Sequence, residues 1–185
     1  MDEAKPEVAI DIGGGEGEFF LRLAKENPQK AFIVLDPEVT KIKEAPPNLH
    51  FICWRTDIDS RLPFLSKKID EAHINFLFGK IGAEDDEDFE SLGKRVGKFR
   101  NLLKDLKNVL KQGAKLHIND ARGNIDNIMR ILKEEGYQVV QGPKRIADEN
   151  KTWWAKTFAD GFKVGGRKEE ESLILPMELE TIWVG

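Results

Sequence analysis

Hydrophobic residues along the chain gather in short runs that alternate with longer segments of helical periodicity. The run Ala31–Leu35 is apolar at every position, which is typical of a strand buried on both faces. Runs of this kind, together with shorter alternating segments, predict strands at Val8–Ile12, Ala31–Leu35, Leu49–Trp54, Ala72–Phe78, Lys115–Asn119, Tyr137–Val140 and Ser172–Met177.

Between these strands, apolar residues recur at spacings of three and four, which indicates helices. The predicted helices contain Phe19–Ala24, Phe89–Leu110 and Asn124–Glu135. We expect the first to end near Asn27-Pro28 and the other two to end at Gln112-Gly113 and Gly136, because glycine commonly stops a helix. Strands that alternate with helices predict an α/β fold, Rossmann-like and doubly wound, with a mainly parallel seven-stranded sheet and helices on both faces.

The most informative motif follows the first predicted strand. It has the pattern D-x-G-x-G-x-G and consists of Asp11, Gly13, Gly14, Gly15 and Gly17. A backbone that turns sharply close to a ligand needs residues without a Cβ, and the first N–H groups of the following helix have no partner within that helix. Open α/β sheets bind ligands at the carboxyl ends of their strands. The motif therefore predicts a nucleotide-type cofactor site.

The spacing of the motif separates three glycine-loop chemistries. A phosphate-binding P-loop needs Lys-Ser or Lys-Thr after its last glycine, whereas Glu18-Phe19 follows here. The dinucleotide motif needs a glycine in sixth place, and counting from Gly13 that place is Glu18. A carboxylate at Asp11 instead suits a cationic ligand without phosphate. A glycine-rich turn that binds nothing is the simplest alternative.

This motif resembles the first motif of the Rossmann-like methyltransferases that use S-adenosylmethionine (SAM), which implies SAM as the cofactor. Asp36 ends the second predicted strand, where such folds bind a ribose diol about 20 residues past the glycine loop. A carboxylate can accept both hydroxyl hydrogen bonds. We therefore assign Asp36 and the adjacent Pro37 to the cofactor site.

Acidic residues also follow the third predicted strand. The resemblance implies that an acid here contacts the adenine amino group, with a neighbouring apolar side chain against the ring. We assign these roles to Asp57 and Ile58, because Asp57 stands nearer the strand end. Asp59 is the alternative, and it could instead cap a following helix.

The fourth predicted strand leads to the methyl acceptor in this fold. Asn75 and Phe78 have the spacing of the polar and aromatic residues in the acceptor motif of nucleic-acid amino methyltransferases, without its two prolines. Over residues 8–136 the chain also resembles the tRNA guanine-N7 methyltransferases. The matching residues are Asp11–Gly17, Arg22-Leu23-Ala24, Glu26-Asn27-Pro28, Ile74-Asn75-Phe76 and Asp120-Ala121-Arg122-Gly123.

A second resemblance is to the aminoglycoside-resistance methyltransferases that modify an adenine N1 of 16S ribosomal RNA. It implies that Phe78 and Trp154 sandwich an extruded base. Together with Asn75 from the acceptor-motif spacing, we assign these two residues as the catalytic set. The acceptor loop would span about 142–168, and we assign Lys156, Arg167 and Lys168 to substrate binding. The matching residues are Asp36-Pro37, Leu62-Pro63-Phe64, Phe76–Gly79, Trp154-Ala155-Lys156 and Arg167-Lys168.

Composition adds limits to this interpretation. The 185 residues are 40% hydrophobic, which is enough for one domain over residues 1–185. No apolar run is long enough to span a membrane, and no leader precedes the first strand, so we expect a cytoplasmic protein.

The single cysteine, Cys53, lies in an apolar run and is expected to be buried and inert. His50, His73 and His117 show no metal-ligand spacing, so we expect them to be structural.

These observations predict a SAM-dependent methyltransferase that acts on a ring nitrogen of a base in structured RNA, either rRNA or tRNA. Such a nitrogen has a free lone pair, so catalysis is mainly alignment, in keeping with the lack of an obvious acid–base pair. The net charge of −4 is unusual for a nucleic-acid binder and favours the first alternative, a small-molecule methyltransferase. The second alternative is a non-catalytic SAM-binding module, which the departures from the family acceptor motifs permit.

Overall fold

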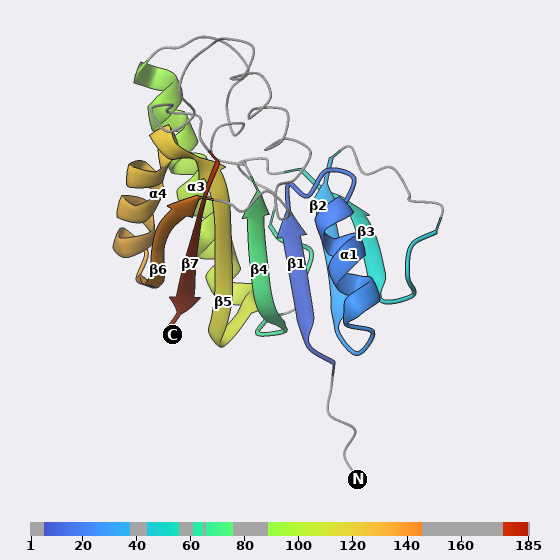
Figure 1. Cartoon of the computed structure of the whole chain (residues 1–185). Coiled ribbons are helices and arrows are strands. Elements are labelled where there is room, and N and C mark those ends of the chain that lie inside the picture. Colours follow the sequence, from blue (N-terminus) through green and yellow to red (C-terminus); the bar gives the residue numbers. More distant parts are fainter. Residues whose placement is uncertain are drawn as a thin grey trace, which may run out of the picture.

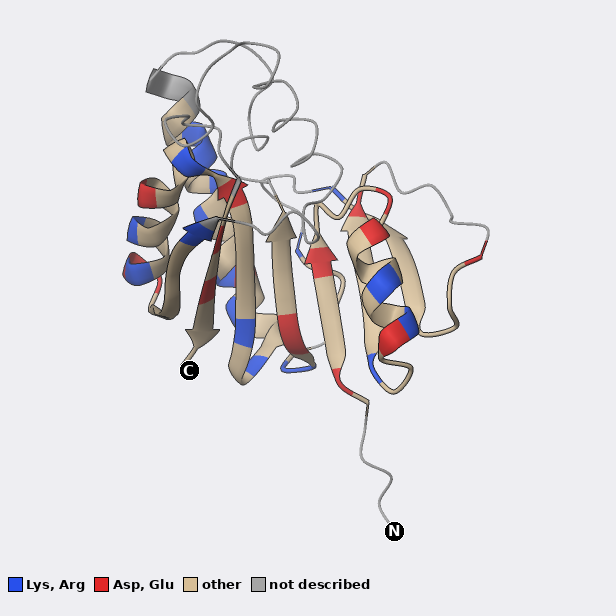
Figure 2. Cartoon of the chain, viewed as in Figure 1, with Lys and Arg blue, Asp and Glu red and all other residues tan. Residues whose placement is uncertain are grey.

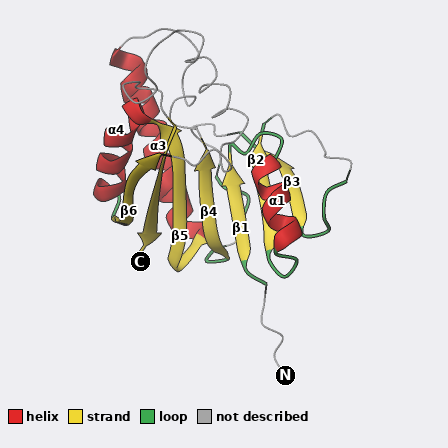
Figure 3. Ribbon diagram, in the orientation of Figure 1, coloured by secondary structure: helices red, strands yellow, loops and turns green. Residues whose placement is uncertain are grey.

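The computed structural model describes residues 6–37, 44–55, 61–64, 66–75, 89–145 and 176–184. Within them, seven strands form one sheet with the order β3-β2-β1-β4-β5-β7-β6, and helices lie on both of its faces (Figure 1, Figure 3). Strands β1 to β5 pair in parallel, and β7 is antiparallel to both β5 and β6. The predicted fold class is confirmed.

The bounds of the elements follow from backbone pairing. The strands are β1 Val8–Ile12, β2 Ala31–Asp36, β3 Leu49–Cys53, β4 Ile69–Asn75, β5 Leu110–Ala121, β6 Tyr137–Arg145 and β7 Pro176–Trp183. The described helices are α1 Glu18–Glu26, α3 Phe89–Val109 and α4 Arg122–Glu134.

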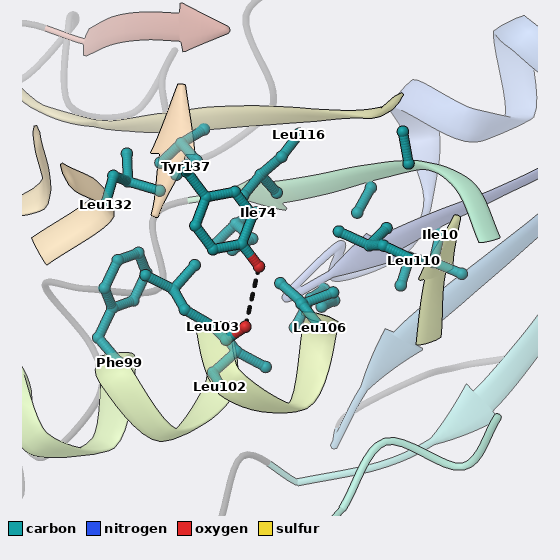
Figure 4. Close-up of a cluster of buried hydrophobic side chains, with 14 of the residues drawn as sticks. Ile10, Ile74, Phe99, Leu102, Leu103, Leu106, Leu110, Leu116, Leu132 and Tyr137 are labelled. Carbon is teal, nitrogen blue, oxygen red and sulfur yellow. Dashed lines mark hydrogen bonds between the residues drawn. The ribbon is translucent and has the colours of Figure 1, made fainter. Parts of the chain in front are cut away.

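The main core lies between one face of the sheet and helices α3 and α4 (Figure 4). Side chains alternate between the two faces along a strand, so Ile10 and Ile74 point to this side, where they join Phe99 and Leu103 of α3. Tyr137 points from β6 toward α3, and its buried hydroxyl donates a hydrogen bond of 2.8 Å to the carbonyl of Leu103. Such a bond contributes about 1 kcal/mol of net stability.

The opposite face of the sheet is divided between apolar and polar residues. Phe20 and Ala24 of α1 pack against Ala9, Phe32 and Val34 of β1 and β2. Of the described helices, α1 is the one on this face, and it lies toward the β1–β3 end of the sheet (Figure 1). Polar residues occupy the same face of β4, β5 and β7, and they are Glu71, His73, Asn75, His117, Asn119 and Glu180.

Several predicted element ends differ from the structure. Strand β4 begins at Ile69 rather than Ala72, and β5 spans Leu110–Ala121 rather than Lys115–Asn119. The long helix ends at Val109 rather than at Gln112-Gly113, because Leu110 already pairs with Ile69 in the ladder between β4 and β5. The last strand continues to Trp183, beyond the predicted end at Met177, because antiparallel pairing with both β5 and β6 extends through polar residues. Residues 172–175 of the predicted strand lie outside the described residues.

The predictions for the start of the acceptor loop and for the burial of Cys53 also need correction. Strand β6 continues to Arg145, so the first residues of the loop expected at about 142–168 are strand, and the others lie outside the described residues. Cys53 is exposed rather than buried, because it ends β3, the strand at one edge of the sheet.

Among the described helices, none has both the length and the apolar character needed to cross a membrane.

Candidate functional site

The glycine motif lies where the order of the strands reverses. Strand β1 is flanked by β2 on one side and by β4 on the other, so the chain builds the sheet outward from β1 in two directions. Ligands of open α/β sheets bind at the carboxyl ends of the strands at such a switch point. The loop of residues 13–17 follows β1 at this edge, and Asn75 ends the neighbouring strand β4 (Figure 1).

The alternate glycines of the motif have left-handed backbone conformations. The φ angles are 76° at Gly13, 56° at Gly15 and 74° at Gly17, values that residues with a Cβ rarely adopt. The amide of Gly13 donates to the carbonyl of Leu35 in β2, and Gly17 is the N-cap residue of α1. The loop therefore turns tightly from β1 into the helix, as the motif predicts.

Gly14 is required for space rather than for its backbone angle. A Cβ at this position would lie 2.6 Å from Oδ2 of Asp11 and 2.9 Å from Cγ1 of Val34. The loop thus packs directly on the carboxylate of Asp11.

Asp11 is a buried carboxylate with one oxygen lacking a partner. Its side chain is 1% exposed, and Oδ1 accepts a hydrogen bond of 2.6 Å from Nδ2 of Asn75. Among the described residues, Oδ2 has no hydrogen-bond partner. Burial raises the pKa of Asp11 to about 7, with a smaller contribution from the nearby charge of Asp36, although the hydrogen bond from Asn75 lowers it.

A row of side-chain amides continues from Asp11 across the sheet. Nδ2 of Asn119 donates a hydrogen bond of 2.6 Å to Oδ1 of Asn75, and the two residues are register partners on β5 and β4. Asn119 was not among the residues predicted from the sequence. Its signal was a polar residue at the end of the fifth predicted strand, but its role becomes visible only through the pairing of β4 with β5.

Asp36 lies beside the glycine loop, where the sequence predicted a ribose-binding acid. It ends β2, and its Oδ2 accepts a hydrogen bond of 2.9 Å from the amide of Gly15. Figure 2 shows acidic residues at the carboxyl ends of β1 and β2. The carboxyl ends of β1 and β2 therefore bring together Asp11, the glycine loop and Asp36. Pro37 directly follows Asp36 in the chain.

The other predicted site residues lie outside the described residues. These are Asp57 and Ile58 of the cofactor set, Phe78 and Trp154 of the catalytic set, and Lys156, Arg167 and Lys168 of the substrate-binding set. Asn75, the remaining predicted catalytic residue, makes its two side-chain hydrogen bonds to Asp11 and Asn119.

The histidines differ in environment. His50 is exposed on β3, whereas His73 and His117 stack with ring centroids 4.6 Å apart beside Glu71. No metal-ligand spacing is visible in the sequence, since His117 lies on a different strand from the other two residues. Hydrogen bonds from both histidines hold the pKa of Glu71 well below its usual range, and burial lowers the pKa of His73.

No family model matches the chain. A curated relative, the tRNA (guanine-N(7)-)-methyltransferase of Lactobacillus johnsonii, is 34% identical over 84 residues. The match covers 40% of this chain and 37% of the relative, so the chain spans little more than a third of that protein's length.

Solved structures similar to the chain include methyltransferases. The 16S rRNA methyltransferase KamB has a TM-score of 0.63 and 16% identity, and the match covers 96% of this chain and 88% of KamB. A mutant of the 16S rRNA (adenine(1408)-N(1))-methyltransferase from Catenulisporales acidiphilia, solved with SAM, has a TM-score of 0.61 and 16% identity, covering 97% and 86%. The chain has the fold of the SAM-dependent methyltransferases. Both resemblances predicted from the sequence are confirmed by these comparisons.

This methyltransferase fold also serves other chemistry. The [4+2]-cyclase SpnF has a TM-score of 0.61 and 13% identity, and the match covers 97% of this chain and 76% of SpnF. A fold does not by itself decide a reaction, so the function must be argued from the site.

Replacing Gly14 with alanine tests the packing of the loop on Asp11. The new Cβ would displace Asp11 or Val34, and we expect a loss of about 1–3 kcal/mol in the free energy of unfolding, measured in urea. The control is Gly93→Ala on α3, where a Cβ would meet open space and better helix propensity should add up to about 1 kcal/mol. Equal stability of Gly14→Ala and the parent would contradict this packing.

Replacing Asp11 with asparagine tests the raised pKa. Between the usual value of 3.8 and about 7, the folded state holds a proton that the unfolded state has lost, so the stability of the parent falls as pH rises through this interval. Asparagine keeps an oxygen for the bond from Asn75 without the charge. We expect Asp11→Asn to be more stable by about 4 kcal/mol at pH 8, since each pKa unit corresponds to about 1.4 kcal/mol, with the difference disappearing toward pH 4. Parallel stability curves of the two proteins would contradict the raised pKa.

Proposed function

We propose that this chain binds SAM at the loop of residues 13–17 and is a SAM-dependent methyltransferase. The observation that carries the proposal is the buried, unpartnered Oδ2 of Asp11 beneath a glycine loop at the switch point of the sheet. A buried carboxylate is costly unless a cation or hydrogen-bond donors offset the lost hydration. A positively charged ligand at this loop would therefore be favoured.

The residues at the site fit SAM better than a dinucleotide. SAM carries an ammonium group, a sulfonium and a ribose diol, and it has no phosphate. Ionised Asp11 would attract its positive charge and would repel a pyrophosphate. Asp36, already bonded to the amide of Gly15, stands where a ribose diol is bound in such folds.

Asn75 and Asn119 are positioning residues in this proposal. Their two hydrogen bonds of 2.6 Å form one chain that ends on Oδ1 of Asp11. The chain orients the carboxylate, and the bond from Asn75 favours its charged form. When bound, SAM would supply an activated methyl group, and the role of this part of the protein is to hold the cofactor in a fixed orientation.

Replacing Asp36 with asparagine tests the cofactor assignment. An asparagine still accepts the hydrogen bond from Gly15, but it loses the charge that would strengthen two hydrogen bonds to a ribose diol. We expect SAM to bind Asp36→Asn about tenfold or more weakly than the parent, measured by calorimetry with SAM and with its demethylated product. The control is Asp126→Asn on the exposed surface of α4, which should bind normally. Unchanged binding by Asp36→Asn would overturn the ribose assignment.

We further propose that the methyl acceptor is a ring nitrogen of a base in structured RNA, either rRNA or tRNA. Support comes from the relatives, which include a tRNA methyltransferase and 16S rRNA methyltransferases. An extruded base needs aromatic faces that replace its lost stacking, and Phe78 and Trp154 are the candidates. Lys156, Arg167 and Lys168 are the proposed phosphate contacts.

Transfer of labelled methyl groups to small ribosomal subunits and to tRNA tests the RNA substrate. Base–aromatic stacking contributes about 1–3 kcal/mol, so Trp154→Ala should reduce transfer by about tenfold or more while SAM binding is unchanged. The neighbouring variant Trp153→Ala is the control and should retain transfer. Equal transfer by Trp154→Ala and the parent would remove Trp154 from the acceptor site.

A small-molecule methyltransferase is the second candidate, because the net charge of −4 does not favour binding to RNA. This candidate binds SAM but modifies neither RNA. Phosphate contacts make the affinity for RNA fall steeply as the salt concentration rises. A small-molecule methyltransferase would show no such salt-dependent binding to RNA.

A further inference from the structure

A second polar cluster lies on β4 and β5, two to four residues before the Asn75–Asn119 pair. Glu71 and His73 point to the same face of β4, and His117 is the register partner of His73 on β5. Oε1 of Glu71 lies 2.9 Å from Nε2 of His73 and 3.3 Å from Nε2 of His117. The potential ligand atoms of the three residues all lie within 4.8 Å of one another.

The three potential ligand atoms lie near the spacing of a metal site. In a tetrahedral zinc site with bonds of about 2.1 Å, ligand atoms are about 3.4 Å apart. Oε1 of Glu71 is 3.3 Å from Nε2 of His117, whereas its 2.9 Å contact with Nε2 of His73 would have to lengthen. Two imidazoles and one carboxylate form a donor set that zinc uses with a fourth position left for water. The rings of His73 and His117 stack with an interplanar angle of 16°, so one ring would have to turn for both Nε2 lone pairs to point at the same ion.

Neighbouring residues orient the potential ligands. Nζ of Lys30 donates a hydrogen bond to Oε2 of Glu71, so Oε1 is the oxygen that faces the histidines. Oε2 of Glu180 lies 3.9 Å from Nδ1 of His117, which is beyond hydrogen-bond distance. With an ion on Nε2, a carboxylate on this side would accept the Nδ1 proton of His117 once the two side chains move closer.

The alternative is a cluster of hydrogen bonds without metal. In it, His73 and His117 each carry a proton on Nε2 and donate to Oε1 of Glu71, across 2.9 and 3.3 Å. A metal site instead needs both Nε2 atoms without a proton, and the experiment below distinguishes the two arrangements.

We propose that Oε1 of Glu71, Nε2 of His73 and Nε2 of His117 bind one divalent transition-metal ion such as Zn²⁺. The ion joins β4 to β5 beneath the residues that position Asp11. Because it binds the folded chain, it stabilises the native state. This site is independent of the proposed SAM site, so either proposal can fail without the other.

The test uses the full chain without an affinity tag, stripped of metal with a chelator. Titration with Co²⁺, followed by visible absorption, and with Zn²⁺, followed by calorimetry, should each show one equivalent bound and an increase in Tm. His117→Gln should weaken binding by about 100-fold or more, because loss of a residue behind the ligands alone costs about 10–100-fold. His50→Gln, on exposed β3, should bind as the parent does.

Two outcomes overturn the proposal. One is a parent protein that binds neither ion stoichiometrically, which leaves the cluster of hydrogen bonds as the correct description. The other is equal binding by His117→Gln and the parent, which places the metal elsewhere. Glu71→Gln is the second variant, and it should also lose the Co²⁺ spectrum of the parent.

Discussion

The buried carboxylate of Asp11 is the constraint on which the candidate site depends. The strand order places this carboxylate at the switch point between β2 and β4. After β1, the glycine loop passes directly over the carboxylate, which is possible because Gly14 has no Cβ. One oxygen is held by Asn75, whereas the other has no partner among the described residues. Burial raises its pKa to about 7, so near neutral pH the carboxyl is only partly ionised, and a bound cation would favour its charged form.

The two faces of the sheet have different roles. Helices α3 and α4 cover one face with a large apolar core, in which Phe99, Leu103 and Ile74 are fully buried. Because that core supplies much of the hydrophobic stabilisation, the other face of β4, β5 and β7 can carry polar groups. Asn75 and Asn119 at the carboxyl ends, and Glu71, His73 and His117 below them, occupy this second face. A single sheet thus supports both proposed sites.

Local signals explain most of what the sequence predicted correctly. Strand β1 has the predicted bounds, and the left-handed Gly13, Gly15 and Gly17 are those of the motif. Predictions were wrong where neighbours in space override local preference. Leu110 joins the sheet before the expected helix stop at Gly113 because it pairs with β4, and Cys53 is exposed because its strand is at the edge.

The sequence by itself determined the fold class, the glycine loop and the position of Asp36, because each depends on residues close together in the chain. Only the tertiary structure decided which polar side chains meet. The bond between Asn75 and Asn119 joins residues 44 positions apart, and the cluster of Glu71, His73 and His117 requires the same register of β4 against β5. Strands β4 and β5 are parallel and joined through α3, so no tight turn fixes their register, which depends on how the two whole strands bury their apolar faces.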